Sequence, residues 1–221
     1  MIGRLCWIVT LLLLCGCGTL KQEPREPEPE PVEEPAEADQ EPQFEFTLLE
    51  PFDIDAQVQA WLSAQSGRES LQVSRAEAGY YLDVQEAQLQ QALQGHGVSL
   101  ARDGDSFLLR VTGAFETNSS GPSVVLRGAL DAIARVVQEF RKTLVIVHSH
   151  TDATGALGYN RWLSEQRAIA VAQHLVEQGV DADRIAAVGH GESDPIQDSG
   201  TPESRVVNRR LEIRLPVIVR E

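Results

Sequence analysis

Residues 150–168 read HTDATGALGYNRWLSEQRA, and they join the end of an apolar run to the start of a periodic segment. The apolar run, residues 144–147, predicts a buried strand. The periodic segment predicts a helix over residues 159–178, which ends before a glycine. Asp152 therefore lies in the connection, directly ahead of the helix. A strand that leads into a helix at this point indicates a fold in which both kinds of element are packed in layers.

The apolar stripe of this predicted helix contains a charged residue. Leu163, Val171 and Leu175 recur with helical spacing, and Arg167 occupies the remaining position of the same series. A guanidinium buried without a partner is costly, so either a nearby carboxylate or a ligand must satisfy it. From the spacing alone, an Asp152–Arg167 ion pair and a ligand site are equally open alternatives.

The segments on both sides of this stretch complete an α+β pattern. Two helices that alternate with strands predict a mixed β-sheet with two helices packed on one face. Residues 52–81 have a weak pattern, with a short helix predicted around residues 58–64 and no role assigned. The remaining predicted elements are a helix over 84–94, strands over 98–101 and 106–111 joined by an Asp103-Gly104 turn, a helix opened by Pro122, and strands over 185–188 and 211–219.

The N-terminus is typical of a secretory signal. Arg4 precedes an apolar run, residues 7–14, that is too short to span a membrane needing roughly twenty apolar residues. The tetrapeptide that ends at Cys17 resembles a bacterial lipobox, so residues 1–16 are predicted to be a signal peptide and Cys17 to carry several acyl chains. Gly18 is not the aspartate of an inner-membrane retention signal, which favours the outer membrane. All three cysteines lie within these first seventeen residues, which excludes disulfides and thiolate metal sites elsewhere.

The segment that follows Cys17, up to residue 51, is predicted to be a disordered, acidic, proline-rich linker. Residues 21–50 contain six of the eleven prolines, eleven acids and two bases. Such a composition cannot bury enough apolar surface to fold, and like charges and proline keep it extended. About thirty residues at about 3.1 Å each reach on the order of 90 Å.

The charge of the chain belongs mainly to this linker. The formal net charge is −14, whereas residues 106–221 hold fourteen acids and thirteen bases and are almost neutral. A nearly neutral domain behind an acidic linker argues against nucleic acid as a partner.

A larger set of residues resembles the OmpA-like, peptidoglycan-binding domain, which is shared with the peptidoglycan-associated lipoproteins of Gram-negative envelopes. The resemblance covers residues 82–221, with a core of 106–216, and many fixed points in order make it far more specific than one short motif. The matching residues are His150-Thr151-Asp152, Gly155, Asn160, Leu163-Ser164, Arg167-Ala168, Gly179-Val180, Arg184-Ile185, Gly189, Gly191-Glu192, Pro195, Asn208-Arg209-Arg210 and Glu212-Ile213.

The resemblance implies that Asp152 and Arg167 grip the diaminopimelate of the cell-wall stem peptide. That side chain ends in an ammonium and a carboxylate on one carbon, so an acid and a guanidinium held close together suit it. The other implied contacts are Thr151, Asn160, Leu163 and Asn118.

Several positions depart from the family pattern or are given a lesser role. Glu116 stands where the family usually has Asp, which puts the role of that carboxylate in doubt. Ser149 replaces the usual Gly before the His-Thr-Asp sequence. Arg209 and Arg210 belong to the closing motif and are interpreted as structural or rim residues.

The function predicted from these features is a non-enzymatic tether: an outer-membrane lipoprotein, facing the periplasm, that binds peptidoglycan and needs no cofactor or metal. One alternative is a module that binds other envelope proteins. A second is a metallohydrolase, because His148, His150 and Asp152 resemble a His-x-His-x-Asp ligand run, although Ala153 stands where that family has another His. A wall-cleaving enzyme is not favoured, since the sequence offers no nucleophile and base or acid pair.

Overall fold

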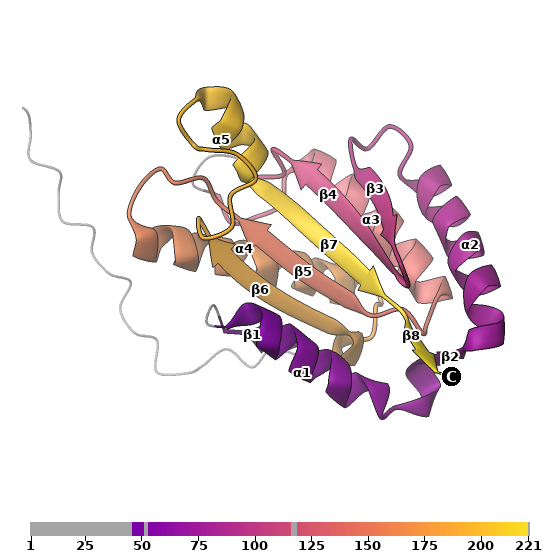
Figure 1. Ribbon diagram of the computed structural model, residues 1–221. Helices are drawn as coiled ribbons and strands as arrows, with labels where there is room; N and C mark the ends of the chain where they lie inside the picture. The colour runs from indigo at the N-terminus through magenta and orange to yellow at the C-terminus, as the bar shows by residue number, and fades with distance from the viewer. Residues whose placement is uncertain (1–45, 51–52, 116–118, 221) are drawn as a thin grey trace, which may run out of the picture. The chain divides into compact units, whose positions relative to one another are not determined.

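The computed structural model describes residues 46–50, 53–115 and 119–220, and this part of the chain alternates helices and strands (Figure 1). In chain order these elements are β1 (Thr47–Leu49), α1 (Ile54–Ser66), a 3-10 turn (Glu69–Leu71), β2 (Gln72–Ser74), α2 (Arg75–Ala92), β3 (Ser99–Asp103), β4 (Ser106–Thr112), α3 (Val124–Glu139), β5 (Val145–His150), α4 (Leu157–Glu177), a 3-10 turn (Ala182–Arg184), β6 (Ile185–Gly191), α5 (Pro202–Asn208), β7 (Arg210–Pro216) and β8 (Ile218–Arg220).

Six of these strands form one mixed sheet in the order β1-β6-β5-β7-β4-β3. The strands β1, β6 and β5 run parallel to one another, whereas β7 pairs antiparallel with both β5 and β4, and β3 with β4. A separate parallel pair joins β2 to β8. The predicted α+β class with a mixed sheet is therefore confirmed.

One face of the sheet packs against helices α2, α3 and α4, and α3 and α4 lie behind the sheet in Figure 1. Side chains alternate along a strand, so Val145 and Val147 of β5 point into this core while Ile146 points to the opposite face. Helix α3 begins after Ser123, whose hydroxyl accepts a hydrogen bond of 3.2 Å from the Leu126 amide. This cap and the helical spacing of its apolar residues explain why α3 forms where it was predicted.

The opposite face of the sheet is partly covered by α1. Trp61 of α1 is buried and clusters with Ile146 of β5 and Val188 of β6. The sequence assigned no role to residues 52–81, although Val58 and Trp61 have the spacing of a helical face. This segment therefore supplies a second layer, in addition to the helices predicted for one face.

Several element boundaries differ from the predicted ones. Helix α2 begins at Arg75, so residue 82, the predicted start of the OmpA-like domain, lies inside a helix. The turn between β3 and β4 consists of Gly104 and Asp105, one residue later than predicted, because Asp103 still pairs with Ser106. The strand predicted over residues 211–219 is two strands, β7 and β8, which belong to different sheets. In the part of the chain that the structure describes, no helix has the length and apolarity to cross a membrane.

Candidate ligand-binding pocket

The Asp152 side chain is held in place by the loop that joins β5 to α4. The Thr151 amide donates to the Gly191 carbonyl at 2.8 Å, which extends the pairing of β5 with β6 by one residue. Asp152 Oδ1 then accepts a hydrogen bond of 2.8 Å from the Thr154 amide. A carboxylate that accepts from the backbone two residues later forms a compact turn, so this oxygen is held by the loop itself.

Asn160 ties this loop to the first turn of α4. Its side-chain amide lies within hydrogen-bond distance of the carbonyls of Asp152 and Thr154, both at 3.2 Å, and of Glu192 Oε2 at 2.6 Å. Asn160 is buried, and each of these contacts joins the helix to a different part of the loop or to the end of β6. Asn160 therefore positions the loop that holds Asp152.

Arg167 lies about two turns after Asn160 on the same face of α4, and it is 2% exposed. Its Nε donates to the Ser119 carbonyl at 2.8 Å, and its guanidinium carbon lies 4.7 Å from the centre of the Phe115 ring. Burial lowers the pKa of Arg167 to about 10, with smaller opposing effects from Tyr159 and Asp152. Arg167 thus stays protonated at neutral pH and carries a full charge in a largely dry environment.

Asp152 forms its ion pair with Arg209, which directly follows α5, rather than with Arg167, as far as the described residues show. Asp152 Oδ2 lies 2.5 Å from an Arg209 guanidinium nitrogen. Burial alone would raise the pKa of Asp152, but the hydrogen bonds from Thr154 and Arg209 outweigh it and hold that pKa below its usual value. The carboxylate is therefore ionised at neutral pH, and one of the two alternatives left open by the sequence, an Asp152–Arg167 pair, is not observed.

These side chains line a pocket of about 350 Å³ between the start of α4 and the end of α5. Five of the six predicted peptidoglycan-binding residues are among those that line it, whereas Asn118, like Glu116, lies outside the described residues. The pocket is lined by Thr151, Asp152, Thr154, Tyr159, Asn160, Leu163, Arg167, Arg205 and Arg209.

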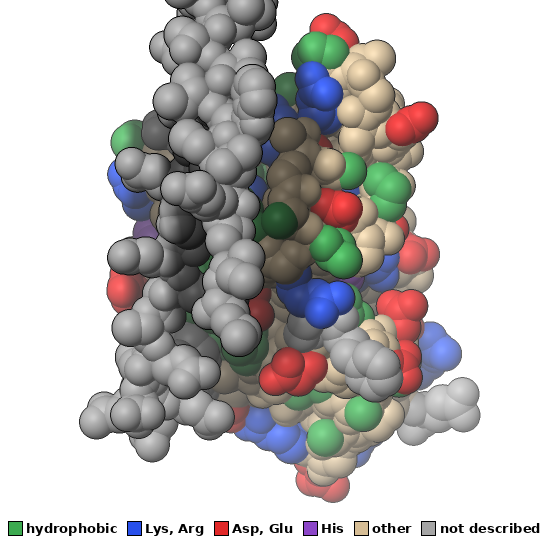
Figure 2. Space-filling view, turned by 90° about the vertical axis from the view of Figure 1, so that its left-hand side faces the viewer, with side chains coloured by type: hydrophobic (Ala, Val, Ile, Leu, Met, Phe, Trp, Pro, Cys, Tyr) green, Lys and Arg blue, Asp and Glu red, His purple; other side chains and the backbone are tan. Residues whose placement is uncertain are grey.

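The charges that line this pocket are unequal. Arg167, Arg205 and Arg209 contribute three guanidinium groups, whereas Asp152 is the one carboxylate among the described lining residues. On the face shown in Figure 2, in contrast, acidic and basic side chains are interspersed. The pocket therefore suits a ligand that brings carboxylates, with an ammonium placed near Asp152.

The comparison with family models agrees with this geometry. The model described as OmpA family matches residues 114–209. Residues 114–209 form an OmpA family domain. The matched range includes every residue that lines the pocket, from Thr151 to Arg209. The resemblance drawn from the sequence is thereby confirmed.

Individual relatives match different lengths of this chain. "Probable lipoprotein YiaD" of Escherichia coli strain K12 is 44% identical over 139 residues, which are 62% of this chain and 64% of YiaD. "Peptidoglycan-binding protein ArfA" of Mycobacterium tuberculosis strain H37Rv is 44% identical over 84 residues, which are 38% of this chain and 26% of ArfA. The chain thus spans less than two thirds of either relative.

A solved structure shares the fold of the OmpA family domain. The cell wall anchor of the T6SS from Pseudomonas aeruginosa superposes with a TM-score of 0.53 at 27% sequence identity. The match covers 59% of this chain and 95% of that chain. The α+β fold described above is therefore shared by a solved protein over almost its full length.

Sequence reasoning missed four of the residues that line the pocket of this OmpA family domain. Thr154 and Tyr159 flank the residues that were chosen, while Arg205 belongs to the short helix α5, which was not predicted. Arg209 was interpreted as structural or as a rim residue, yet it pairs with Asp152 across 57 positions of sequence. The two arginines that follow Asn208 were the sign of a possible binding site in the sequence. Their spacing from other residues could not show that Arg209 reaches Asp152.

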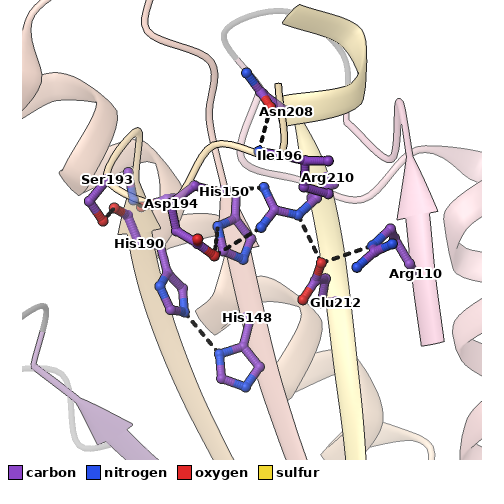
Figure 3. Close-up of polar contacts among 12 residues, drawn as sticks. Arg110, His148, His150, His190, Ser193, Asp194, Ile196, Asn208, Arg210 and Glu212 are labelled. Atoms are coloured by element: carbon purple, nitrogen blue, oxygen red, sulfur yellow. Dashed lines mark hydrogen bonds and ion pairs between the residues drawn. The ribbon is translucent and has the colours of Figure 1, made fainter. Parts of the chain in front are cut away.

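The histidines of the OmpA family domain lie apart from this pocket. His148 and His150 of β5 adjoin His190 of β6, and Figure 3 shows them beside Asp194 and Arg210. In the described residues, the group of potential metal ligands that comes together is His150, His190 and Asp194, without Asp152. The metallohydrolase alternative built on His148, His150 and Asp152 is therefore wrong about its carboxylate, because Asp152 turns toward Arg209.

Proposed function

We propose that this chain is a non-enzymatic peptidoglycan-binding lipoprotein of the outer membrane, which grips the diaminopimelate of the stem peptide. The observation that carries the proposal is one pocket lined by both an ionised Asp152 and a buried, charged Arg167. A relative named as a peptidoglycan-binding protein and a similar structure titled as a cell wall anchor support it. The pocket then serves as the ligand site, with an acid and a guanidinium on its wall.

In this proposal the two ends of the zwitterion meet opposite charges. The ligand's ammonium donates to Asp152, and its carboxylate accepts from Arg167, whose planar guanidinium suits a carboxylate. Arg205 and Arg209 add positive charge beside this point, which suits further carboxylates of an acidic stem peptide. Leu163 packs against the methylene part of the ligand, so the pocket combines one apolar contact with convergent polar groups.

Binding without catalysis fits the groups that line the pocket. Bond cleavage by a carboxylate pair needs two acids whose pKa values are pushed apart. The described lining residues supply Asp152 alone, and Arg209 holds it ionised. We therefore assign the pocket to recognition rather than to hydrolysis of the wall.

The anchoring part of the proposal depends on the N-terminal sequence. Residues 17–45, which include Cys17 and most of the predicted linker, lie outside the described residues, whereas the end of the predicted linker is ordered, because Thr47–Leu49 form β1. The name of the relative YiaD includes the word lipoprotein. Acyl chains on Cys17 anchor the protein in the membrane, because each buried methylene contributes about 0.8 kcal/mol. The folded domain binds the wall. The chain then links the outer membrane to the peptidoglycan, and its contact with the peptidoglycan is non-covalent.

Sedimentation with purified sacculi tests the site. Asp152→Ala and Arg167→Ala are each expected to weaken binding about tenfold to a hundredfold, since each removes a charged hydrogen-bond partner. A matched control is the exposed pair of Asp83 and Arg102, whose side chains lie 2.7 Å apart on α2 and β3. Asp83→Ala and Arg102→Ala are expected to sediment like the unchanged protein.

Two results would overturn the proposal. One is a double variant of Asp152 and Arg167 that still sediments with sacculi while circular dichroism shows it folded. The other is wild-type binding that free diaminopimelate-containing muropeptide does not displace. Displacement of a bound envelope protein by the same muropeptide would instead show that the pocket also serves protein partners.

A further inference from the structure

A cluster of three histidines and one aspartate lies on the opposite face of the sheet from α3 and α4. His148 follows Ile146 by two residues, and His190 follows Val188 by two. Residues two apart on a strand share a face, so these rings lie on the α1 side, where Ile146 and Val188 pack. Asp194 reaches the cluster from the loop after β6 (Figure 3). No residue of this cluster lines the proposed peptidoglycan pocket.

Three ring nitrogens of the buried histidines in this cluster lack hydrogen-bond partners. Both ring nitrogens of His150, which is 2% exposed, and Nε2 of His148 are buried with no hydrogen-bond partner among the described residues. Asp194 Oδ2 lies 3.9 Å from His150 Nδ1, beyond hydrogen-bond distance. A buried polar atom left unpaired costs about 1–3 kcal/mol, so such groups normally have a partner. Two unpaired nitrogens on one buried ring point to something that binds there.

From this arrangement we infer that His150, His190 and Asp194 form a binding site for a divalent transition-metal ion such as Zn²⁺. One ligand atom from each residue lies within 4.8 Å of the others. Two imidazoles and a carboxylate are a common ligand set for such ions, with the remaining position open to water. The rings of His150 and His190 stack at 4.3 Å with their planes 16° apart, so one ring turns about its side-chain torsions to direct its lone pair at the ion.

The neighbouring residues support these ligands in the way that the second layer of a metal site does. His148 Nδ1 lies 2.9 Å from His190 Nε2, so His190 can donate to His148 through one nitrogen and bind the ion through the other. Arg210 donates to the backbone carbonyl of Asp194 and to one of its carboxylate oxygens, both at 3.0 Å. These bonds orient the Asp194 side chain.

The positive charge beside the site is already paired. Glu212 lies 2.8 Å from Arg210 and 2.9 Å from Arg110. With Asp194 included, two carboxylates match these two guanidinium groups. Arg210 therefore orients Asp194, and Arg110 and Arg210 each have a carboxylate partner.

Equilibrium dialysis against Zn²⁺ tests the site in the full chain. Cys6→Ser, Cys15→Ser and Cys17→Ser are introduced first, so that no thiol competes for the ion. One ion per chain is expected, and Co²⁺ is expected to bind with the visible absorption of a four-coordinate complex. His150→Ala and His190→Ala are expected to reduce the affinity at least tenfold.

Two further variants keep the test decisive. Asp194→Asn changes an exposed side chain and keeps an oxygen that can accept from Arg210, and circular dichroism checks that the variant is folded. His96→Gln removes a histidine outside the cluster and is expected to bind normally. Absence of stoichiometric binding, or binding that His190→Ala and Asp194→Asn leave unchanged, would overturn the inference. Sacculus sedimentation in the presence of a chelator is expected to be unaffected, which separates this site from the peptidoglycan pocket.

Discussion

At the scale of single residues, two buried arginines serve different purposes. Arg167 and Arg184 are both 2% exposed. Arg184 donates to the carbonyls of Val137, Phe140 and Thr143, at 2.9 to 3.3 Å, and so closes the connection between α3 and β5. Arg167 also donates to a backbone carbonyl, that of Ser119, but unlike Arg184 it lines the pocket. Arg184 therefore serves the fold, while Arg167 is in addition assigned to a ligand in the proposed function.

Replacing each arginine by methionine is expected to separate these roles. Arg167→Met is expected to weaken sacculus binding at least tenfold while the chain stays folded, because a buried charge is replaced by an apolar side chain of similar length. Arg184→Met is expected to lower the free energy of unfolding by about 3 kcal/mol, since it leaves carbonyls unpaired. Urea unfolding and sacculus sedimentation measure the two effects. The reverse pattern, with binding tied to Arg184, would contradict the assignment.

The pairing of Asp152 with Arg209 predicts how the pKa of the Asp152 carboxyl changes when Arg209 is removed. Arg209→Ala removes a hydrogen bond and a positive charge from Asp152, so the pKa of that carboxyl is expected to rise from its lowered value. As the pH falls, the variant therefore loses its ionised Asp152 at a higher pH than the unchanged protein does. Ligand binding that depends on this charge is lost at the same point. Carbon-13 NMR of labelled aspartate follows this titration. An unchanged pKa would show that the Thr154 amide alone sets it.

How far the sequence predicted the site depends on the distance between partners along the chain. Asp152, Asn160 and Arg167 lie within one strand, loop and helix, and their shared face follows from helical spacing. Arg209 joins them only because β7 lies beside β5 in the sheet, and that neighbourhood is a property of the topology. The histidine cluster was missed for the same reason, since His190 comes from the next strand along.

At the scale of elements, α4 packs so closely on β6 that a glycine is required between them. A Cβ added at Gly189 would lie 2.3 Å from the Glu165 amide nitrogen and 2.6 Å from its Cα. The Ser164 hydroxyl also accepts from the Gly191 amide at 2.8 Å, which fixes the helix on the strand. This approach places the start of α4, and with it Asn160, beside the loop that holds Asp152.

Gly189→Ala is therefore expected to lower the free energy of unfolding by about 3 kcal/mol or more, because a helix backbone rather than a flexible side chain must move. Gly158→Ala, in the first turn of the same helix, meets nothing within 4 Å and is expected to be neutral or slightly stabilising. Chemical denaturation compares the two. Similar stabilities for both variants would contradict the close packing of α4 on β6.

The strands β4 and β7 are joined by a partly buried ion pair, between Arg110 and Glu212, whose effect on stability depends on pH. Burial alone raises the pKa of Glu212, but hydrogen bonds from Arg210 and Arg110 outweigh it and lower that pKa. A lowered carboxyl pKa contributes stability that is present above the ordinary value and lost as the pH falls through the lowered one. Glu212→Gln is expected to lower the free energy of unfolding by about 1.5–3 kcal/mol at neutral pH, with the difference shrinking in acid. A difference that stays constant with pH, in denaturation curves from neutral to acidic solution, would argue against the ion pair.

The predicted elements succeeded where local apolar spacing was strong. Helix α3 and strand β5 have continuous apolar patterns and formed within a few residues of their predicted positions. Helix α1 has fewer apolar residues, among them Val58 and Trp61, and its helical state makes sense only once the sheet offers Ile146 and Val188 as partners. Tertiary packing therefore decided the elements that local pattern left open.

At the scale of the whole molecule, the sequence divides into parts with different physical behaviour. The described residues form a layered domain with a core on both faces of one sheet. The composition ahead of it, acidic and rich in proline, predicts an extended tether between Cys17 and this domain. If the proposed function is correct, the distance that the tether spans determines whether membrane and wall can be held at the same time.

Deleting residues 24–38 tests this dependence on length. The deletion removes about half of the linker and is expected to reduce its reach from on the order of 90 Å to about 45 Å. Binding of the purified variant to sacculi is expected to be unchanged, because Asp152 and Arg167 are untouched. Cross-linking of the lipid-anchored protein to the wall in cells is expected to fall, and a flexible Gly/Ser segment of the original length, with a root-mean-square span of about 30 Å, is expected to restore it only in part. Equal cross-linking for the shortened and the original linker would mean that the gap is narrower than the extended tether, and that reach is not what this composition provides.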